Sequence, residues 1–140
     1  MKKGFSLLEA LLFLGVTAIL LYVGSNALLN LAPKYRLTRA TWEIQTRLNY
    51  ARYRAIFEGR AVRVSFKPKG YTIEKFDEEL KEWKADISGS FEGVKVEANN
   101  SPTFYPLGTV SNLATITVSN SWGSFRITLA ISGRIRVSQI

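Results

Sequence analysis

The 140-residue sequence contains no cysteine and no histidine. These absences exclude disulfide frameworks, zinc sites built from cysteine and histidine, thiol nucleophiles and histidine-based catalytic triads. They do not establish a reducing compartment, because a secreted domain can also lack cysteine. The folded part of the chain must therefore obtain its stability from packing.

The sequence also lacks the patterns on which most enzymes depend. No spacing concentrates a pair of carboxylates, and no glycine-rich loop of the phosphate-binding kind is present. The acidic stretch at residues 77–82 does not have the alternating Asp-x-Asp pattern of a calcium loop. We therefore expect no catalytic residue, no cofactor and no metal site.

One long apolar segment, residues 5–33, is interrupted by a single carboxylate, Glu9. A secretory signal peptide has an apolar region of only about 7–15 residues, so this segment is too long for one. About 20 apolar residues suffice for a membrane-spanning helix. A charge at bilayer depth costs at least about 2.5–3.5 kcal/mol, so Glu9 is expected to have a function that offsets this cost.

The Gly-Phe-Ser-Leu-Leu-Glu motif at residues 4–9 resembles the N-terminal signature of type IV pilins and pseudopilins. The resemblance implies that residues 1–4 are a leader peptide and that prepilin peptidase cleaves between Gly4 and Phe5. It also implies that Phe5 is N-methylated and that Glu9 is retained for assembly. Removal of the two leader lysines lowers the formal net charge of +8 by two, to +6.

Glu9 follows Phe5 by four residues, which is one helical turn. A free amine on Phe5 is a cation in a low-dielectric medium, where a carboxylate interacts with it far more strongly than in water. The family resemblance implies that Glu9 also pairs with the amine of an adjacent subunit. We therefore expect Glu9 to favour filament assembly.

Basic residues flank the apolar segment on both sides, so the positive-inside rule does not fix its orientation. Two lysines precede it, and Lys34, Arg36 and Arg39 follow it. The resemblance of the leader places the N-terminus in the cytoplasm. We expect a single-pass protein of the bacterial inner membrane, embedded in its lipid, with residues 34–140 in the periplasm and with later assembly into a pilus or pseudopilus.

Residues 34–58 are amphipathic, whereas residues 5–33 are apolar on every face. Pro33 lacks a backbone donor and is expected to kink or restart the helix. Steps of three and four residues predict one buried face, formed by Leu37, Thr41, Ile44, Leu48, Ala51 and Ala55. Glu58 followed by Gly59 predicts the end of the helix. The remaining aromatic side chains are expected either to cover the sheet or to line subunit contacts, namely Trp42, Tyr50, Tyr53 and Phe57.

Residues 61–140 are predicted to form an antiparallel β-sheet. Alternation from Val62 to Phe66, a turn at residues 67–70 and a second alternating run predict a hairpin. A polar loop is expected at residues 77–82, a short strand at 94–97 and a turn at 99–102. The C-terminal part is expected to form a meander, with strands at 114–118, at 125–131 and at 135–137. Ile131 is expected to close the alternating run of the second strand, and Ile135 and Val137 to form the inner face of the last one.

The C-terminal part resembles the GspH/FimT branch of the pseudopilins. The resemblance rests on several features, namely Phe104, Gly108-Thr109, the strand at residues 115–117, the strand at 125–131 and the closing segment at 133–137. It implies an α+β fold, in which one long N-terminal helix packs by its C-terminal half on an antiparallel β-sheet domain. It further implies a minor subunit that initiates or caps a type II secretion pseudopilus, or that acts in a type IV pilus.

The Gly-Arg-Ile-Arg sequence at residues 133–136 has two alternative interpretations. Because strand side chains alternate, Arg134 and Arg136 leave the strand on the same face, and Arg126 across a hairpin joins them. Some FimT-type proteins capture DNA through a basic motif of this pattern, and phosphate contacts of this kind weaken as salt rises. Alternatively, the arginines simply protect an edge strand against aggregation.

Together these features predict a minor pilin or pseudopilin whose partners are other pilin subunits and prepilin peptidase. In a secretion pseudopilus the periplasmic domain is expected to contact secreted proteins. In a pilus for natural transformation its basic residues are expected to meet DNA. The sequence leaves these two functions open.

Overall fold

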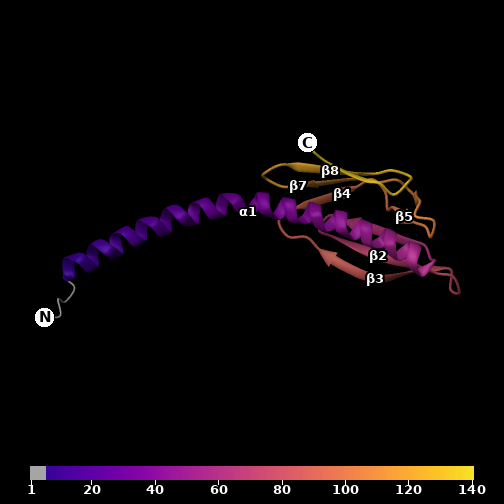
Figure 1. The fold of residues 1–140 in the computed structure, drawn as a ribbon, viewed down its shortest axis with the longest axis horizontal. Helices are drawn as coiled ribbons and strands as arrows, with labels where there is room; N and C mark the ends of the chain where they lie inside the picture. Colours follow the sequence, from indigo (N-terminus) through magenta and orange to yellow (C-terminus); the bar gives the residue numbers. More distant parts are fainter. Residues whose placement is uncertain (1–5) are drawn as a thin grey trace. The chain divides into compact units, whose positions relative to one another are not determined.

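The computed structural model describes residues 6–140, apart from the side chains of residues 26–30. Within these residues the chain forms one α-helix, α1 (Leu7–Glu58), followed by nine β-strands (Figure 1). It divides into two compact units between Ala32 and Pro33. The first unit is helical, and the second contains the rest of α1 and all the strands.

The first unit contains the apolar part of α1. Its segment Leu7–Ser25 is long and apolar enough to cross a membrane, and none of that segment is buried by the rest of the protein. Nineteen helical residues are about 28 Å long, close to the ~30 Å hydrocarbon core of a bilayer. A helix that is apolar all round requires lipid or other helices around it.

α1 continues through Pro33, so the expected restart of the helix at this residue is wrong. Proline removes one backbone donor, but the turns on either side keep their own hydrogen bonds. The Pro33 carbonyl accepts a hydrogen bond from Asn120 Nδ2 at 2.7 Å. A side chain distant in sequence therefore binds the helix at the position where proline weakens it.

The predicted buried face of residues 34–58 is confirmed. All six predicted residues are buried, and Ala40 joins them. α1 ends at Glu58, as expected, and Gly59 follows with a φ of 65°. Glycine adopts this left-handed conformation without the steric cost that a side chain would add.

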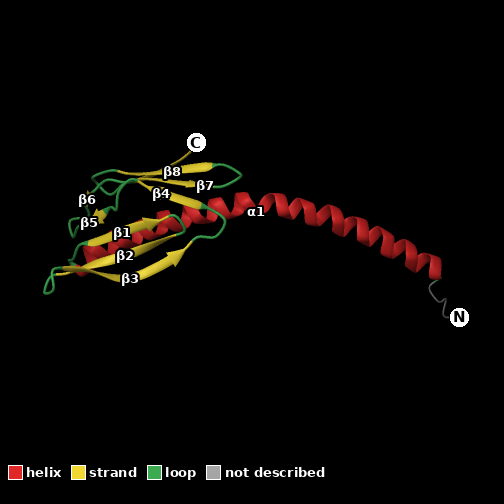
Figure 2. Cartoon of the chain, turned by 180° about the vertical axis from the view of Figure 1, so that it is seen from behind, coloured by secondary structure: helices red, strands yellow, loops and turns green. Residues whose placement is uncertain are grey.

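The strands form two antiparallel sheets rather than the single predicted sheet, and the predicted C-terminal meander is confirmed as three consecutive strands of one of them. Sheet A has the order β3-β2-β1-β5-β6, with bounds β1 (Val62–Lys67), β2 (Gly70–Asp77), β3 (Glu82–Ser90), β5 (Thr103–Phe104) and β6 (Val110–Ser111). Sheet B has the order β4-β7-β8-β9, with bounds β4 (Lys95–Ala98), β7 (Thr115–Ser119), β8 (Ser124–Leu129) and β9 (Ile135–Gln139). Figure 2 shows β1, β2 and β3 side by side, with β4, β7 and β8 as a separate group.

Two local predictions are corrected. The loop expected at residues 77–82 is shorter, because β2 includes Asp77 and β3 begins at Glu82. β8 ends at Leu129, so Ile131, which was predicted to belong to this strand, lies in the following turn and is 65% exposed. The Ile131 carbonyl accepts a hydrogen bond from the Val110 amide of β6 at 2.9 Å. The strand ends before Ile131 because the chain turns towards β6 at this point.

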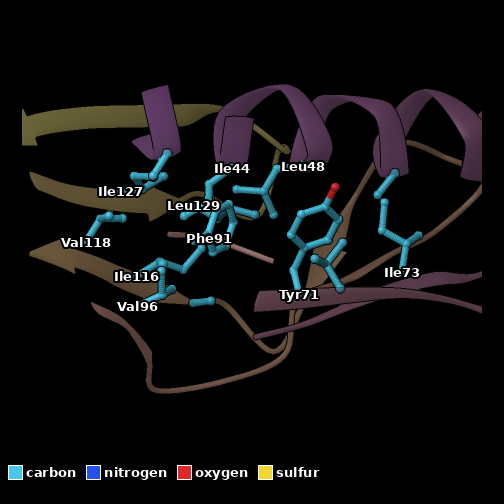
Figure 3. Close-up of a cluster of buried hydrophobic side chains, with 14 of the residues drawn as sticks. Ile44, Leu48, Tyr71, Ile73, Phe91, Val96, Ile116, Val118, Ile127 and Leu129 are labelled. Carbon is cyan, nitrogen blue, oxygen red and sulfur yellow. The ribbon is translucent and has the colours of Figure 1, made fainter. Parts of the chain in front are cut away.

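The hydrophobic core lies between α1 and the inner faces of both sheets. Figure 3 shows Ile44 and Leu48 of α1 in one cluster with Tyr71 and Ile73 of sheet A and with aliphatic side chains of sheet B. The sheet B contribution is aliphatic, consisting of Val96, Ile116, Val118, Ile127 and Leu129. This shared core makes residues 33–140 one folding unit that presents the outer surfaces of α1 and of the sheets.

Candidate functional site

Glu9 lies in the first turn of α1. The helix begins at Leu7, and the Ser6 carbonyl accepts a hydrogen bond from the Ala10 amide at 3.1 Å. Within Leu7–Ser25, Glu9 is the only charged residue. The predicted cleavage site between Gly4 and Phe5 lies outside the described residues.

The position of Glu9 suits a carboxylate for two local reasons. The first amides of a helix lack intrahelical acceptors, and the helix dipole makes that end positive. Ser6 and Glu9 also have the Ser-x-x-Glu spacing of a capping box. The helix end therefore stabilises a negative charge within a segment that is otherwise apolar.

An aromatic stripe runs along α1 opposite its buried face. We define it as Tyr35, Trp42, Tyr50, Tyr53 and Phe57. Each of the five side chains is exposed, and Phe57 is 92% exposed. At about 100° per residue all five fall within a narrow sector on the far side of the helix from Ile44. These aromatics do not cover the sheets, which rules out one of the two predicted roles.

An apolar depression of about 620 Å³ adjoins the distal end of the aromatic stripe. Tyr50, Tyr53, Ile56 and Phe57 form its apolar lining. Large apolar patches on a soluble surface are typical of protein or membrane contacts. The aromatic stripe and this depression are therefore the strongest candidate interaction surface of the second unit.

The structure places Arg126 and Arg136 on the outer face of sheet B. Both are exposed, and they alternate with Ile127 and Val137, which face the core. Arg126 pairs with Ser138 and Arg136 with Thr128 across β8 and β9. Diagonal neighbours in this register lie about 7–8 Å apart. The exposed Arg134 precedes β9, and we call these three arginines the basic face.

Arg52 joins the two glycine turns that flank the basic face. Gly108 and Gly133 both have a φ of 77° and both are buried. A Cβ on Gly133 would lie 2.7 Å from Arg52 Nε and 2.9 Å from the Gly108 carbonyl oxygen. The Arg52 Nε is itself buried and has no hydrogen-bond partner in the protein. Sequence reasoning missed Arg52, because nothing local shows that a helix residue will pack on two distant turns.

Four charged side chains connect the end of α1 to sheet A. Arg54 Nε donates to Glu58 Oε1 at 2.6 Å and Arg54 also bonds Asp86. Lys75 Nζ lies 3.1 Å from Glu58 Oε2. The hydrogen bond from Arg54, assisted by Lys75, lowers the pKa of the Glu58 carboxyl. This network was not predicted, since its partners come from α1, β2 and β3.

The Glu58→Gln variant is expected to be less stable than the wild type at neutral pH. A carboxylate with a lowered pKa stabilises the folded state above its unfolded pKa of about 4.3, and this contribution is lost as the pH falls through the folded value. The difference between the two proteins should therefore shrink on acidification. Thermal unfolding from pH 7 to pH 3 measures this, and a constant difference would contradict the assignment.

Comparison with known proteins places these features in a family. Residues 40–138 match the family model of the type II transport protein GspH. No curated protein sequence matches the chain. The structure is similar to the minor pseudopilin EpsH of the type 2 secretion system of Vibrio cholerae, with a TM-score of 0.64 and 15% identity over 74% of this chain and 97% of that one.

A second solved structure, the type IV minor pilin FimU of Pseudomonas aeruginosa, has a TM-score of 0.62 and 20% identity. The structural alignment covers 75% of this chain and 90% of the FimU chain. These likenesses show the pilin-like α+β fold, in agreement with the fold expected from the sequence. The family match extends over residues 40–58 of α1, both sheets and the basic face. The chain belongs to the GspH family of type II transport proteins and has the fold of the minor pseudopilins.

Proposed function

We propose that this protein is a membrane-anchored minor subunit of a type II secretion pseudopilus or a type IV pilus, and that it acts in initiation or tip assembly of the filament for protein secretion. The observation that carries the proposal is the combination of Glu9 in an otherwise apolar first unit with an exposed aromatic stripe on the second. Both features need a neighbouring subunit. The proposed work is structural, and no catalytic residue is assigned.

The proposed assembly chemistry begins with removal of residues 1–4 by prepilin peptidase. The new amine of Phe5, once N-methylated, is a cation near the start of α1. Glu9 neutralises it in the same chain or in an adjacent subunit, and the low dielectric of the bilayer strengthens this interaction. Residues 5–33 hold the subunit in the inner membrane until it enters the filament, with residues 34–140 in the periplasm.

Substitutions in the aromatic stripe test this function directly. Trp42→Ser combined with Tyr53→Ser is expected to reduce the amount of the protein in purified filaments severalfold, because both side chains are exposed and contribute apolar area to an interface rather than to the core. The thermal stability of the isolated protein should stay unchanged. Quantitative immunoblotting of the filament fraction provides the measurement.

Leu107→Ser serves as the matched control, because Leu107 is 91% exposed but lies outside α1. It should leave filament incorporation at the wild-type level. Equal incorporation of the stripe variant and the wild type would contradict the proposed interface.

A second candidate function, capture of DNA for natural transformation, is favoured by one observation. Arg126, Arg134 and Arg136 are all exposed and lie on or beside two adjacent strands. Among residues 6–140, no ion pair involves any of them. Their charges are therefore available to phosphates, which bind such a surface without regard to sequence.

Binding of duplex DNA by the full-length protein in neutral detergent, at two salt concentrations, tests this candidate. Arg134→Ala combined with Arg136→Ala is expected to weaken binding and to reduce the salt slope by about two, one for each phosphate contact. Lys67→Ala combined with Lys69→Ala removes the same charge from the end of β1 and the turn that follows it, and should have little effect. Equal losses in both variants, or no binding by the wild type, would eliminate the motif as a DNA site.

A further inference from the structure

A cluster of basic and aromatic side chains surrounds α1 where the second unit begins. We define it as the collar: Lys34, Tyr35, Arg36, Arg39 and Trp122. All five residues are exposed. Four come from the first two turns of α1 within the second unit, and Trp122 comes from the turn between β7 and β8.

A side-chain hydrogen bond holds the β7–β8 turn against this part of α1. Asn120 Nδ2 donates to the Pro33 carbonyl at 2.7 Å, and Asn120 Oδ1 accepts from the Trp122 amide at 2.9 Å. Lys34 Nζ lies 5.3 Å from the centre of the Trp122 ring, within cation–π distance. The turn therefore holds an exposed indole next to the first cation that follows the apolar segment.

The other flank of the collar is formed by the loop between β3 and β4. Gly93 has a φ of 68°, and a Cβ there would lie 2.8 Å from Arg36 Cδ, so the Arg36 side chain lies directly on this loop. Arg36 and Arg39 line a cavity of about 330 Å³ together with Ser90, Phe91 and Glu92. Glu43 also lines it, and its carboxylate accepts a hydrogen bond from the Tyr71 hydroxyl at 3.3 Å.

The cations of the collar have no carboxylate partner within residues 6–140. None of the ion pairs formed there includes Lys34, Arg36 or Arg39. Glu92 is the exposed acid beside them, and Glu43 lies a further turn along the helix from Arg39. Three unpaired cations beside exposed tyrosine and tryptophan rings have the composition of a membrane–water interface, where aromatic rings and basic side chains gather.

The distance along the chain agrees with that chemistry. Lys34 follows Ser25, the last residue of the candidate span, by nine residues, or about 14 Å of helix. The headgroup layer is about 5–7 Å thick on each side of the hydrocarbon core. Lys34 therefore lies beyond the headgroup layer by less than about one Debye length. At that distance anionic headgroups still attract lysine and arginine side chains.

We propose that the collar docks the second unit onto the outer leaflet of the membrane through anionic phospholipid headgroups before the subunit enters a filament. Because the helix already tethers the domain, docking is intramolecular and needs only a few weak contacts. Phosphates of the headgroups attract Lys34, Arg36 and Arg39, and the Trp122 ring faces the headgroups beside Lys34. Release from the membrane then requires loss of these contacts when the subunit is extracted.

Quenching of Trp122 by a lipid with a nitroxide headgroup tests the proposal. The full-length protein with Trp42→Phe and Trp83→Phe retains Trp122 as its reporter, and it is reconstituted in phosphatidylcholine with or without phosphatidylglycerol. Quenching is expected to be at least about twofold stronger with phosphatidylglycerol and to weaken at high salt. Arg36→Gln combined with Arg39→Gln should abolish this difference, whereas Glu92→Gln should enlarge it.

Two controls complete the experiment. Arg126→Gln combined with Arg136→Gln removes the same charge from the basic face and should leave the quenching unchanged. A protein with Trp42→Phe and Trp122→Phe reports on Trp83, which packs against Arg63 and Phe76, and this ring should be weakly quenched in both lipids. Equal quenching of Trp83 and Trp122, or the same quenching of Trp122 with and without phosphatidylglycerol, would overturn the proposal.

Discussion

Glu9→Ala is expected to leave membrane insertion intact and to lower the incorporation of the protein into filaments at least about tenfold, because a low-dielectric medium strengthens the lost charge pair. Alanine makes Leu7–Ser25 more apolar, so the membrane anchor itself cannot suffer. What is lost is the partner of the Phe5 amine. Membrane fractionation and immunoblotting of purified filaments measure the two quantities separately.

Glu9→Gln separates the charge of this side chain from its shape. Glutamine keeps the size and hydrogen-bonding capacity of glutamate. If Glu9→Gln lowers filament incorporation as much as Glu9→Ala does, the effect belongs to the carboxylate charge. Thr17→Ala is the matched control, since its hydroxyl donates only to the Phe13 carbonyl of the same helix, at 2.7 Å. Wild-type amounts of the Glu9→Ala protein in filaments would remove Glu9 from the assembly mechanism.

Phe104→Ala is expected to destabilise the folded domain by about 3–5 kcal/mol, the usual range for a fully buried phenylalanine. Phe104 is 0% exposed and lies in β5, where it pairs with Val62 of β1 and with Val110 of β6. Its ring therefore fills the core at the point where three strands meet. The free energy of unfolding of a domain of this size is only about 5–15 kcal/mol, so the substitution removes a large fraction of it.

Chemical unfolding of the full-length protein in detergent measures this loss. Leu107→Ala, three residues further along and almost fully exposed, should change the free energy of unfolding by less than about 0.5 kcal/mol. Similar effects of the two substitutions would show that Phe104 does not anchor the core.

The sequence predicted the helix and its buried face well because both depend on local periodicity. Leu37, Ile44 and Leu48 recur at helical spacing, and their burial follows directly from it. The alternation of Arg126 and Arg136 with Ile127 and Val137 likewise placed the arginines on one face. The N-terminal motif depends on residue identity alone, and its processing still awaits a test.

The features that were missed depend on contacts between distant segments. The predicted hairpin of β1 and β2 is confirmed, but β3 was missed: it is largely exposed, so it lacks the apolar alternation that identifies a strand, and it joins the sheet by pairing with β2. The division into two sheets follows from the pairing of β1 with β5 and of β4 with β7, which no single segment encodes. Arg52 contacts turns more than 50 residues away. Periodicity cannot reveal any of these.

Mass spectrometry of the N-terminal peptide of this protein, recovered from purified filaments, tests the central claim most directly. The account predicts a peptide that begins at N-methylated Phe5 and contains Glu9, with residues 1–4 absent. A chain that retains Met1 in the filament fraction, or a processed chain that never reaches that fraction, would contradict its assignment as an assembled pilin-like subunit.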